Sequence, residues 1–242
     1  MTAPDAPVLS ARGLGLRAGT REVFTGLDFE APAGSLVVLR GRAGAGKTAL
    51  LLALAGRLRT TSGTLTVLGH DLPREAAAVR RRTGLAEVRG VNDLEDALTV
   101  EQHVAERLVL HQPWWRPWAS RAQVAEQLAR VDRALDTTAD AGAPVPRLRP
   151  REFVSDVDPL ERMALGVVLA LVGRPDVLLV DDVDSLRRTD ERVRAWLALS
   201  AVRRTAPHPV TVVATCSDTL DVPLGTDPVV IDLDASTPER TA

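Results

Sequence analysis

The sequence GRAGAGKT, at Gly41–Thr48, constrains the fold of this chain more than any other stretch. It follows the apolar run Leu36–Leu39 and precedes the leucine-rich run Ala49–Leu58, so a strand, a glycine-rich turn and a helix are predicted in that order. The backbone N–H groups of such a turn point inward and bind phosphate oxygens, and the positive N-terminal end of the helix faces the same ligand. The stretch is therefore predicted to be a phosphate-binding loop.

The basic residue of this loop differs chemically from every other basic residue of the chain. Of the 30 lysine and arginine residues, Lys47 is the only lysine. A compact ammonium fits between phosphates where a planar guanidinium does not, so Lys47 is predicted to reach the β and γ phosphates of a nucleotide. The Thr48 hydroxyl is predicted to hold Mg²⁺. The predicted nucleotide-binding residues are Gly41, Arg42, Ala43, Gly44, Ala45, Gly46, Lys47, Thr48 and Ala49.

A second apolar run ends in two carboxylates. Val177–Val180 is continuously apolar, as expected of a strand that is buried on both faces, and Asp181 and Asp182 follow it directly. In phosphate-loop enzymes the first of these carboxylates holds Mg²⁺ through its water shell, and the next one positions or polarises the attacking water. We therefore predict Lys47, Asp181 and Asp182 as catalytic residues, with Asp181 and Thr48 at the metal.

The remaining patterns predict a single α/β domain over residues 1–242, of the phosphate-loop NTPase type. Its core sheet is expected to be mostly parallel, with antiparallel strands near the N-terminus and a helical subdomain at about residues 87–172. The net charge of −2 argues against nucleic acid as a partner. No apolar run reaches the roughly 18 residues of a membrane span. A cytoplasmic location is therefore expected, with any membrane association made through a partner.

Four segments, taken in order, resemble the ATP-binding cassette family, the nucleotide-binding subunits of ABC transporters. After the phosphate loop come TSGTLTVLGHDL at Thr61–Leu72, ALTVEQHV at Ala97–Val104 and GRPDVLLVDD at Gly173–Asp182. The resemblance covers nearly the whole chain and implies a subunit that binds and hydrolyses Mg–ATP. It also implies two partners, a membrane-spanning transporter subunit and a second nucleotide-binding subunit, as a homodimer or heterodimer. The location implied is the inner face of the cell membrane.

The chain departs from the family pattern at positions that contact the base, the partner subunit and the attacking water. Ala18 stands at the place of the family's adenine-stacking aromatic residue, and Glu87 or Val88 at that of its glutamine. The LSGGQ signature is matched by Val157–Glu161, and the catalytic glutamate by Asp182. Ser185–Arg188 matches the D-loop, and Cys216 matches the switch histidine. The loss of a group that acts on the attacking water or the γ-phosphate typically costs on the order of 10²-fold in rate. The resemblance and its departures together imply ATP binding with slow or partner-dependent hydrolysis.

Two further interpretations of the sequence stay open. The chain is alternatively an ATP-binding regulatory module without sustained turnover, or another phosphate-loop NTPase such as a small-molecule kinase. Trp114, Trp115 and Trp118 lie between two predicted helices, where family members contact the membrane subunit. These tryptophans are expected either to form a docking patch for a helix of that subunit or to close the core of the helical subdomain.

Overall fold

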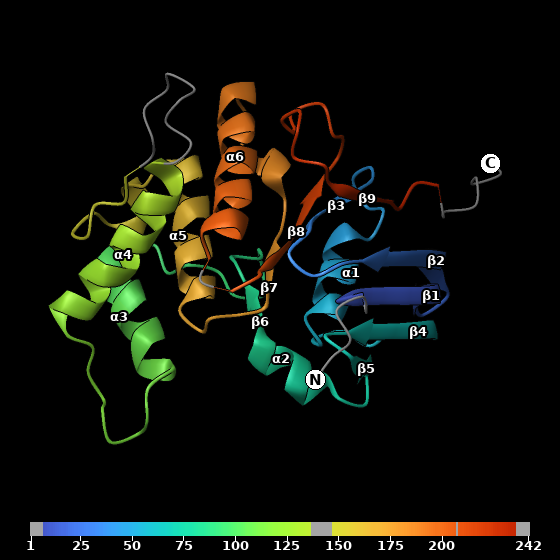
Figure 1. Ribbon diagram of the computed structural model, residues 1–242, viewed down its shortest axis with the longest axis horizontal. Coiled ribbons are helices and arrows are strands. Elements are labelled where there is room, and N and C mark those ends of the chain that lie inside the picture. Colours follow the sequence, from blue (N-terminus) through green and yellow to red (C-terminus); the bar gives the residue numbers. More distant parts are fainter. Residues whose placement is uncertain (1–6, 137–146, 207, 236–242) are drawn as a thin grey trace.

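The strands form two separate sheets, as the computed structural model in Figure 1 shows. The structure describes residues 7–136, 147–206 and 208–235. In the larger sheet every pair of neighbouring strands is parallel, which confirms the predicted α/β class with a parallel core sheet. In the order in which they lie side by side, the strands of this sheet are β6 (Thr83–Leu85), β7 (Val177–Val180), β8 (Thr211–Cys216), β3 (Leu36–Arg40) and β9 (Val229–Asp232).

The predicted antiparallel strands form a sheet of their own and do not extend the parallel one. β1 and β2 form a hairpin, and β4 then returns to the other edge of β1, so that Leu9 lies opposite both Ala31 and Val67. The strand patterns alone do not predict this arrangement, because the pairing of β1 with β4 joins residues that are far apart in the sequence. In spatial order the strands are β2 (Arg21–Ala31), β1 (Leu9–Ala18), β4 (Ser62–Val67) and β5 (His70–Leu72).

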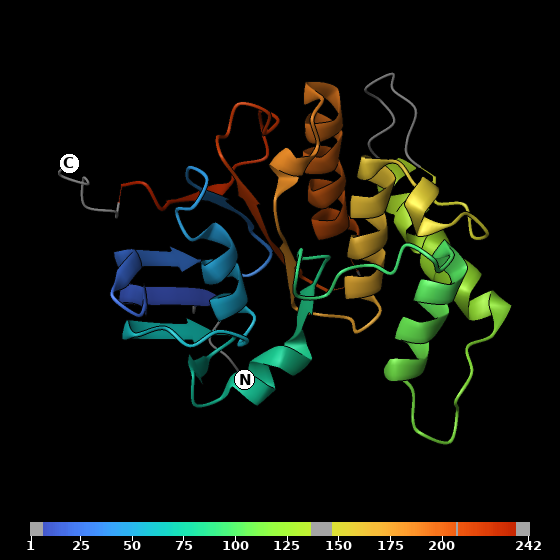
Figure 2. The same cartoon turned by 180° about the vertical axis from the view of Figure 1, so that it is seen from behind.

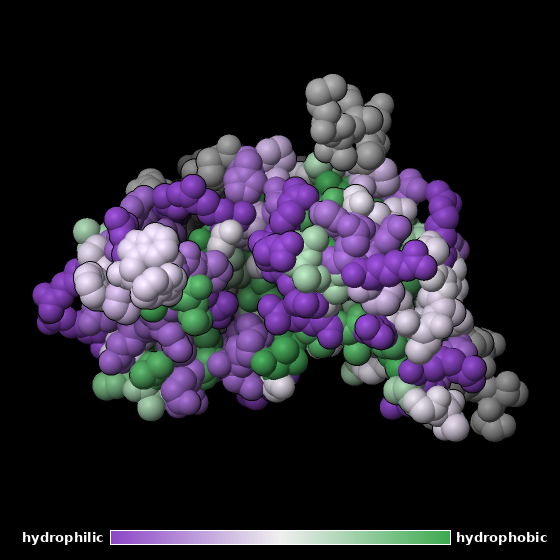
Figure 3. Space-filling model, turned by 90° about the horizontal axis from the view of Figure 1, so that it is seen from below, coloured by the Kyte–Doolittle hydropathy of each residue, from purple (hydrophilic) through white to green (hydrophobic). Residues whose placement is uncertain are grey.

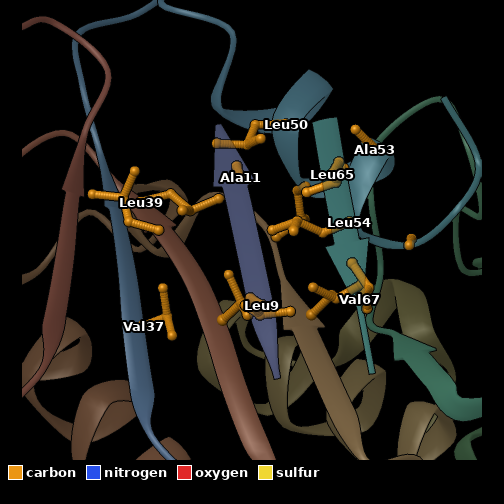
Figure 4. Close-up of a cluster of buried hydrophobic side chains, with 14 of the residues drawn as sticks. Leu9, Ala11, Val37, Leu39, Leu50, Ala53, Leu54, Leu65 and Val67 are labelled. Carbon is orange, nitrogen blue, oxygen red and sulfur yellow. The ribbon is translucent and has the colours of Figure 1, made fainter. Parts of the chain in front are cut away.

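Helix α1 (Lys47–Leu54) lies between the two sheets and carries the phosphate loop at its N-terminal end. Figure 4 shows Leu50 and Leu54 of this helix among side chains from β1, β3 and β4. Both leucines are fully buried, and removing such a side chain from water contributes roughly 1.5–3 kcal/mol to stability. The packing of α1 therefore holds the phosphate loop in a fixed position relative to both sheets.

The helices beyond α1 lie mostly on the side of the parallel sheet that faces away from the antiparallel one (Figures 1 and 2). Thr99 caps α3 with a capping box: its hydroxyl accepts from the Gln102 N–H, and the Gln102 side chain accepts from the Thr99 N–H. None of the helices in the described ranges combines the length and the apolar character of a membrane span. The helices and short 3₁₀ turns are α2 (Ala76–Arg82), α3 (Val100–Leu110), α4 (Arg121–Asp136), η2 (Val154–Asp156), α5 (Pro159–Leu171), η3 (Val183–Ser185) and α6 (Thr189–Thr205).

Helix α5 belongs to two hydrophobic cores at once. Its Leu165 and Val168 pack in a cluster with side chains of α3 and α4, whereas its Val167 and Ala170 pack in a second cluster with β7, β8 and α6. The region that contains α3 and α4 thus has a core of its own, and α5 joins it to the parallel sheet. The limits of a helical subdomain at about residues 87–172 stay a prediction.

Candidate nucleotide-binding site

The phosphate loop connects the end of β3 to the start of α1 and packs closely against β2. Gly46 has a φ of +92°, and a Cβ atom there would meet Val23 Cγ1 at 2.6 Å and Phe24 Cδ1 at 3.0 Å. Gly44 has a φ of +81°. Side chains other than hydrogen strongly disfavour such backbone angles, and at Gly46 there is also no room for one. The glycine spacing of the motif is therefore a requirement of the loop's own conformation.

The Lys47 side chain turns back over this loop. Its Nζ donates hydrogen bonds to the carbonyl oxygens of Gly41, at 2.5 Å, and Arg42, at 3.0 Å. The side chain is half-buried, so the ammonium group stays at the surface of the loop. These contacts hold a single positive charge beside the backbone that is predicted to bind the phosphates.

The Asp181 carboxylate at the end of β7 is held by two hydroxyl groups. Thr48 Oγ1 donates to Asp181 Oδ2 at 2.7 Å, and Thr215 Oγ1 donates to Asp181 Oδ1 at 2.7 Å. The Thr215 hydroxyl also accepts from the backbone N–H of Asp182 at 2.7 Å. Thr215 is fully buried on β8, and it was not singled out from the sequence. The signal that could have identified Thr215 is its position, as a polar residue near the end of a buried strand that neighbours β7.

The Thr48 hydroxyl and the Asp181 carboxylate fit a magnesium ion. Hydroxyl and carboxylate oxygens are hard ligands of the kind that Mg²⁺ prefers. Thr48 Oγ1 and Asp181 Oδ2 are 2.7 Å apart, so both could face one ion, which Asp181 would hold through its water shell. A bound Mg²⁺ would neutralise charge on the β and γ phosphates. The assignment of these two residues to the metal stays a prediction.

Asp182 occupies a strained position next to this carboxylate. Its φ of 52° and ψ of 58° place it in the left-handed region, which non-glycine residues rarely adopt. Burial raises the pKa of the Asp182 carboxyl, and the nearby carboxylates of Asp181 and Asp184 raise it further. A carboxylate with a raised pKa is a better proton acceptor, which suits the predicted role of Asp182 beside an attacking water.

Cys216, at the end of β8, cannot act as the family's histidine does. The residue is 1% exposed. Burial raises the pKa of its thiol to about 12, with smaller contributions from Asp184 and Asp218. The neutral thiol is at best a weak hydrogen-bond donor and carries no charge for a phosphate group.

Glu87, one of the two residues matched to the family's glutamine, is bound within the chain by an arginine of α5. Arg162 donates from Nε to Glu87 Oε2 at 2.9 Å and from Nη2 to Glu87 Oε1 at 2.7 Å. Its third nitrogen, Nη1, donates to Asp96 Oδ1 at 2.7 Å. Hydrogen bonds to Glu87 raise the pKa of Arg162 well above its ordinary value. The carboxylate of Glu87 is therefore engaged by α5, and the sequence did not predict this pair.

The segment that aligns with the family signature forms the start of α5. Asp158 is the N-cap residue and Pro159 is the first residue of the helix, and both are exposed. A proline has no N–H to donate, and a carboxylate repels a phosphate group. Neither residue is therefore suited to bind a phosphate group.

Arg21 lies beside the phosphate loop, although the sequence did not single it out. The β1–β2 hairpin pairs Ala18 with Arg21, and both residues are exposed. Nη2 of Arg21 is 4.0 Å from the position that a Cβ atom on Gly44 would take. A guanidinium group can attract phosphate oxygens or stack on an aromatic base. The hairpin thus offers a cation near the loop, where the family has an aromatic residue at the position of Ala18.

The parallel sheet, together with a phosphate loop at the end of a buried strand, defines a phosphate-loop NTPase of the α/β class. The family model described as "ABC transporter" matches residues 24–185, which include the phosphate loop and both carboxylates that follow β7. The chain therefore belongs to the ABC transporter family.

Individual relatives agree with this assignment. The chain is 28% identical to an aliphatic sulfonates import ATP-binding protein, SsuB 1, of Mesorhizobium japonicum, over 86% of this chain and 72% of that protein. It is 34% identical to the cytochrome c biogenesis ATP-binding export protein CcmA of Nitrobacter winogradskyi, over 76% of this chain and 80% of the relative. Against several other relatives the chain spans only 54–65% of their length. The solved structure of cbiO1 from Clostridium perfringens, part of the ABC transporter complex cbiONQ, is 18% identical with a TM-score of 0.72, over 95% of this chain and 86% of that one.

Proposed function

We propose that this chain is the ATP-binding subunit of a membrane ABC transporter, and that it binds Mg–ATP through Gly41–Ala49. The observation that carries this proposal is the meeting of three groups at the loop: the Lys47 ammonium, the Thr48 hydroxyl and the Asp181 carboxylate. They supply a charge for the phosphates and two oxygen ligands for a metal. Relatives named as ATP-binding import and export proteins support the same class of function.

Hydrolysis by this subunit is proposed to be slow or dependent on its partners. Asp158 and Pro159 replace the phosphate-binding part of the signature, Glu87 is engaged by Arg162, and Cys216 is buried as a neutral thiol. Losing a group that stabilises the transition state typically costs on the order of 10²-fold in rate. Asp182 keeps a carboxylate at the water-activating position, so a residual rate is expected.

Calorimetric titration with ATP, with and without Mg²⁺, tests the binding site. We expect Lys47→Ala to weaken ATP binding by on the order of 10²-fold, because hydrogen bonds between charged groups contribute about 1.5–3 kcal/mol each. Lys47→Arg is the matched variant: it keeps the charge, and we expect it to bind ATP weakly because a guanidinium does not fit within the loop. An unchanged ATP affinity in Lys47→Ala would contradict the proposed site.

Turnover measurements test the rest of the proposal. The purified chain is expected to hydrolyse ATP far more slowly than the order of 10 per second that is typical of enzymes. Rapid turnover that Lys47→Ala abolishes would show that the altered signature does not limit catalysis. Reconstitution with a membrane subunit separates a transporter subunit, whose turnover rises with the partner, from a regulatory module, which binds ATP without such a rise.

A further inference from the structure

The connection between α3 and α4 carries three tryptophans that the protein does not bury. In this tryptophan loop, residues 111–120, Trp114, Trp115 and Trp118 are 88%, 62% and 70% exposed. Leu110, the last residue of α3, is 71% exposed. The expectation that the tryptophans close the core of the helical region is therefore wrong, because that core is filled by smaller side chains from α3, α4 and α5.

The shape of the tryptophan loop favours contact with a broad surface and disfavours a role as one wall of a groove. Trp114 and Trp115 lie edge to face, with ring centroids 6.0 Å apart and an angle of 85° between the planes, so their exposed faces point in different directions. Pro113 and Pro117 restrict the backbone on either side and limit its collapse onto the helices. In Figure 1 the loop projects from the end of α3, at the lower left. Figure 3, seen from below, shows pale residues of intermediate hydropathy protruding at that end of the molecule.

Along the chain, the charged residues nearest to the loop are all positive. Between Glu106 and Glu126 the sequence contains no acidic residue and three arginines, which are Arg107, Arg116 and Arg121. Arg116 and Arg121 are exposed. Arginines next to an anionic surface and tryptophans at the level of lipid headgroups are the combination that a membrane–water interface favours.

We infer that the tryptophan loop binds directly to the surface of a membrane that contains anionic lipids. The three indole rings would enter the headgroup layer, and Arg116 and Arg121 would lie against the phosphates of the lipids. This inference goes beyond the proposed function, in which the chain reaches the membrane only through a partner. The loop also lies apart from the phosphate loop in the fold, so lipid binding and ATP binding are separable properties of the chain.

Sedimentation of the purified full chain with lipid vesicles tests this inference without any partner. Vesicles of phosphatidylcholine with about one-third phosphatidylglycerol supply the anionic surface, and pure phosphatidylcholine is the reference. We expect W114S/W115S/W118S to weaken binding by on the order of 100-fold, because each ring has a large apolar area to bury. We expect R116Q and R121Q to weaken binding to the anionic vesicles by about fivefold each.

A matched control comes from the second exposed apolar loop of the chain. Leu220 and Leu224 are 88% and 103% exposed but lie in a loop after β8. L220S/L224S is expected to bind vesicles as the unchanged protein does. Titration with Mg–ATP and thermal melting verify that each variant is folded, since all of the substituted side chains are exposed.

Fluorescence locates the contact. Trp196 is 1% exposed within the core. A blue shift of the tryptophan emission, and its quenching by brominated lipids, would therefore report on the loop tryptophans alone. Failure of the unchanged protein to sediment with anionic vesicles, or equal binding by W114S/W115S/W118S, would overturn the inference. A dimer in sedimentation velocity that this variant abolishes, without vesicle binding, would assign the loop to a protein contact and would equally overturn it. Loss of ATP binding in Lys47→Ala, with vesicle binding kept, would show that the two sites are independent.

Discussion

Replacing Thr215 with valine removes one oxygen atom from the candidate site and leaves the shape of the side chain almost unchanged. The hydroxyl donates to Asp181 Oδ1 and accepts from the Asp182 N–H, each at 2.7 Å, and Thr215 is fully buried. A hydrogen bond to a charged group contributes about 1.5–3 kcal/mol, and a buried N–H left without a partner costs about 1–3 kcal/mol. Because Asp181 keeps its contact with Thr48, we expect a net loss of about 2 kcal/mol in the free energy of unfolding.

The functional consequence should appear in the effect of Mg²⁺ on ATP binding. Thr48 and Asp181 would hold the Mg²⁺, and the hydrogen bond from Thr215 would orient the Asp181 carboxylate toward it. Without that hydroxyl, the Asp181 side chain has to be ordered when the metal binds, which costs about 0.5–1.5 kcal/mol. We therefore expect Thr215→Val to reduce the Mg²⁺-dependent part of the ATP affinity by about twofold to tenfold, and to leave binding in EDTA nearly unchanged.

Thr211 is the matched control for this experiment. It lies on the same strand, is 1% exposed, and accepts one hydrogen bond from the Gly34 N–H at 2.9 Å, away from the site. Thr211→Val should lower the free energy of unfolding by about 1 kcal/mol and leave the Mg²⁺ effect intact. Calorimetric titration of ATP with Mg²⁺ and with EDTA, together with urea unfolding, measures both quantities. If Thr215→Val keeps the full Mg²⁺ effect, Thr215 does not position Asp181 for a metal.

Three further predictions concern the surroundings of the loop. Arg162→Met should lower the free energy of unfolding in urea by about 3 kcal/mol, because it leaves the largely buried Glu87 carboxylate without a cation and, among the described residues, with only the Leu94 N–H as a hydrogen-bond partner. Arg12→Met, at a pair with side chains 74% and 52% exposed, should change it by less than about 1 kcal/mol; equal effects would refute this. The pKa of Asp182 is raised in the fold, so its carboxylate destabilises the protein at neutral pH and this cost disappears as the pH falls through the folded-state pKa. Asp182→Asn should therefore raise the melting temperature by about 2 °C at pH 7, lose that advantage in acid, and abolish turnover; a lower melting temperature at pH 7 would contradict the electrostatic cause. Arg21→Ala should weaken ATP binding by about fivefold in calorimetric titration, whereas Arg17→Ala on the same hairpin should leave it unchanged; no difference between the two would remove Arg21 from the site.

The parts of the site that the sequence predicts are those in which neighbouring residues act together. The phosphate loop is contiguous, and its conformation depends on its own glycines and on the strand and helix that flank it. The run that ends in Asp181 and Asp182 is likewise a local pattern, a buried strand followed by two charges. The α/β class follows from such local patterns, and it is confirmed by the parallel sheet.

The residues that the sequence did not reveal act across the fold. Thr215 reaches Asp181 only because β8 lies beside β7 in the sheet, and Arg21 reaches the loop only because the hairpin folds over it. The exposure of Trp118 and its two neighbours depends on which smaller side chains already fill the helical core. Periodicity predicts the elements, but these contacts depend on how the elements are placed against one another.

Glu87 is in contact with α5, the helix that begins with the altered signature segment. A largely buried carboxylate needs a cation, and Arg162 provides one for Glu87 directly after the altered signature segment. The arginine also binds Asp96, so three side chains tie α5 to the segment that follows β6. Glu87→Gln would leave Arg162 with Asp96 as its single carboxylate partner. Separating α5 from this segment would break a bidentate ion pair, which costs more than separating an arginine from a neutral amide. The contacts of Arg162 therefore connect the altered signature segment to one of the residues matched to the family's glutamine.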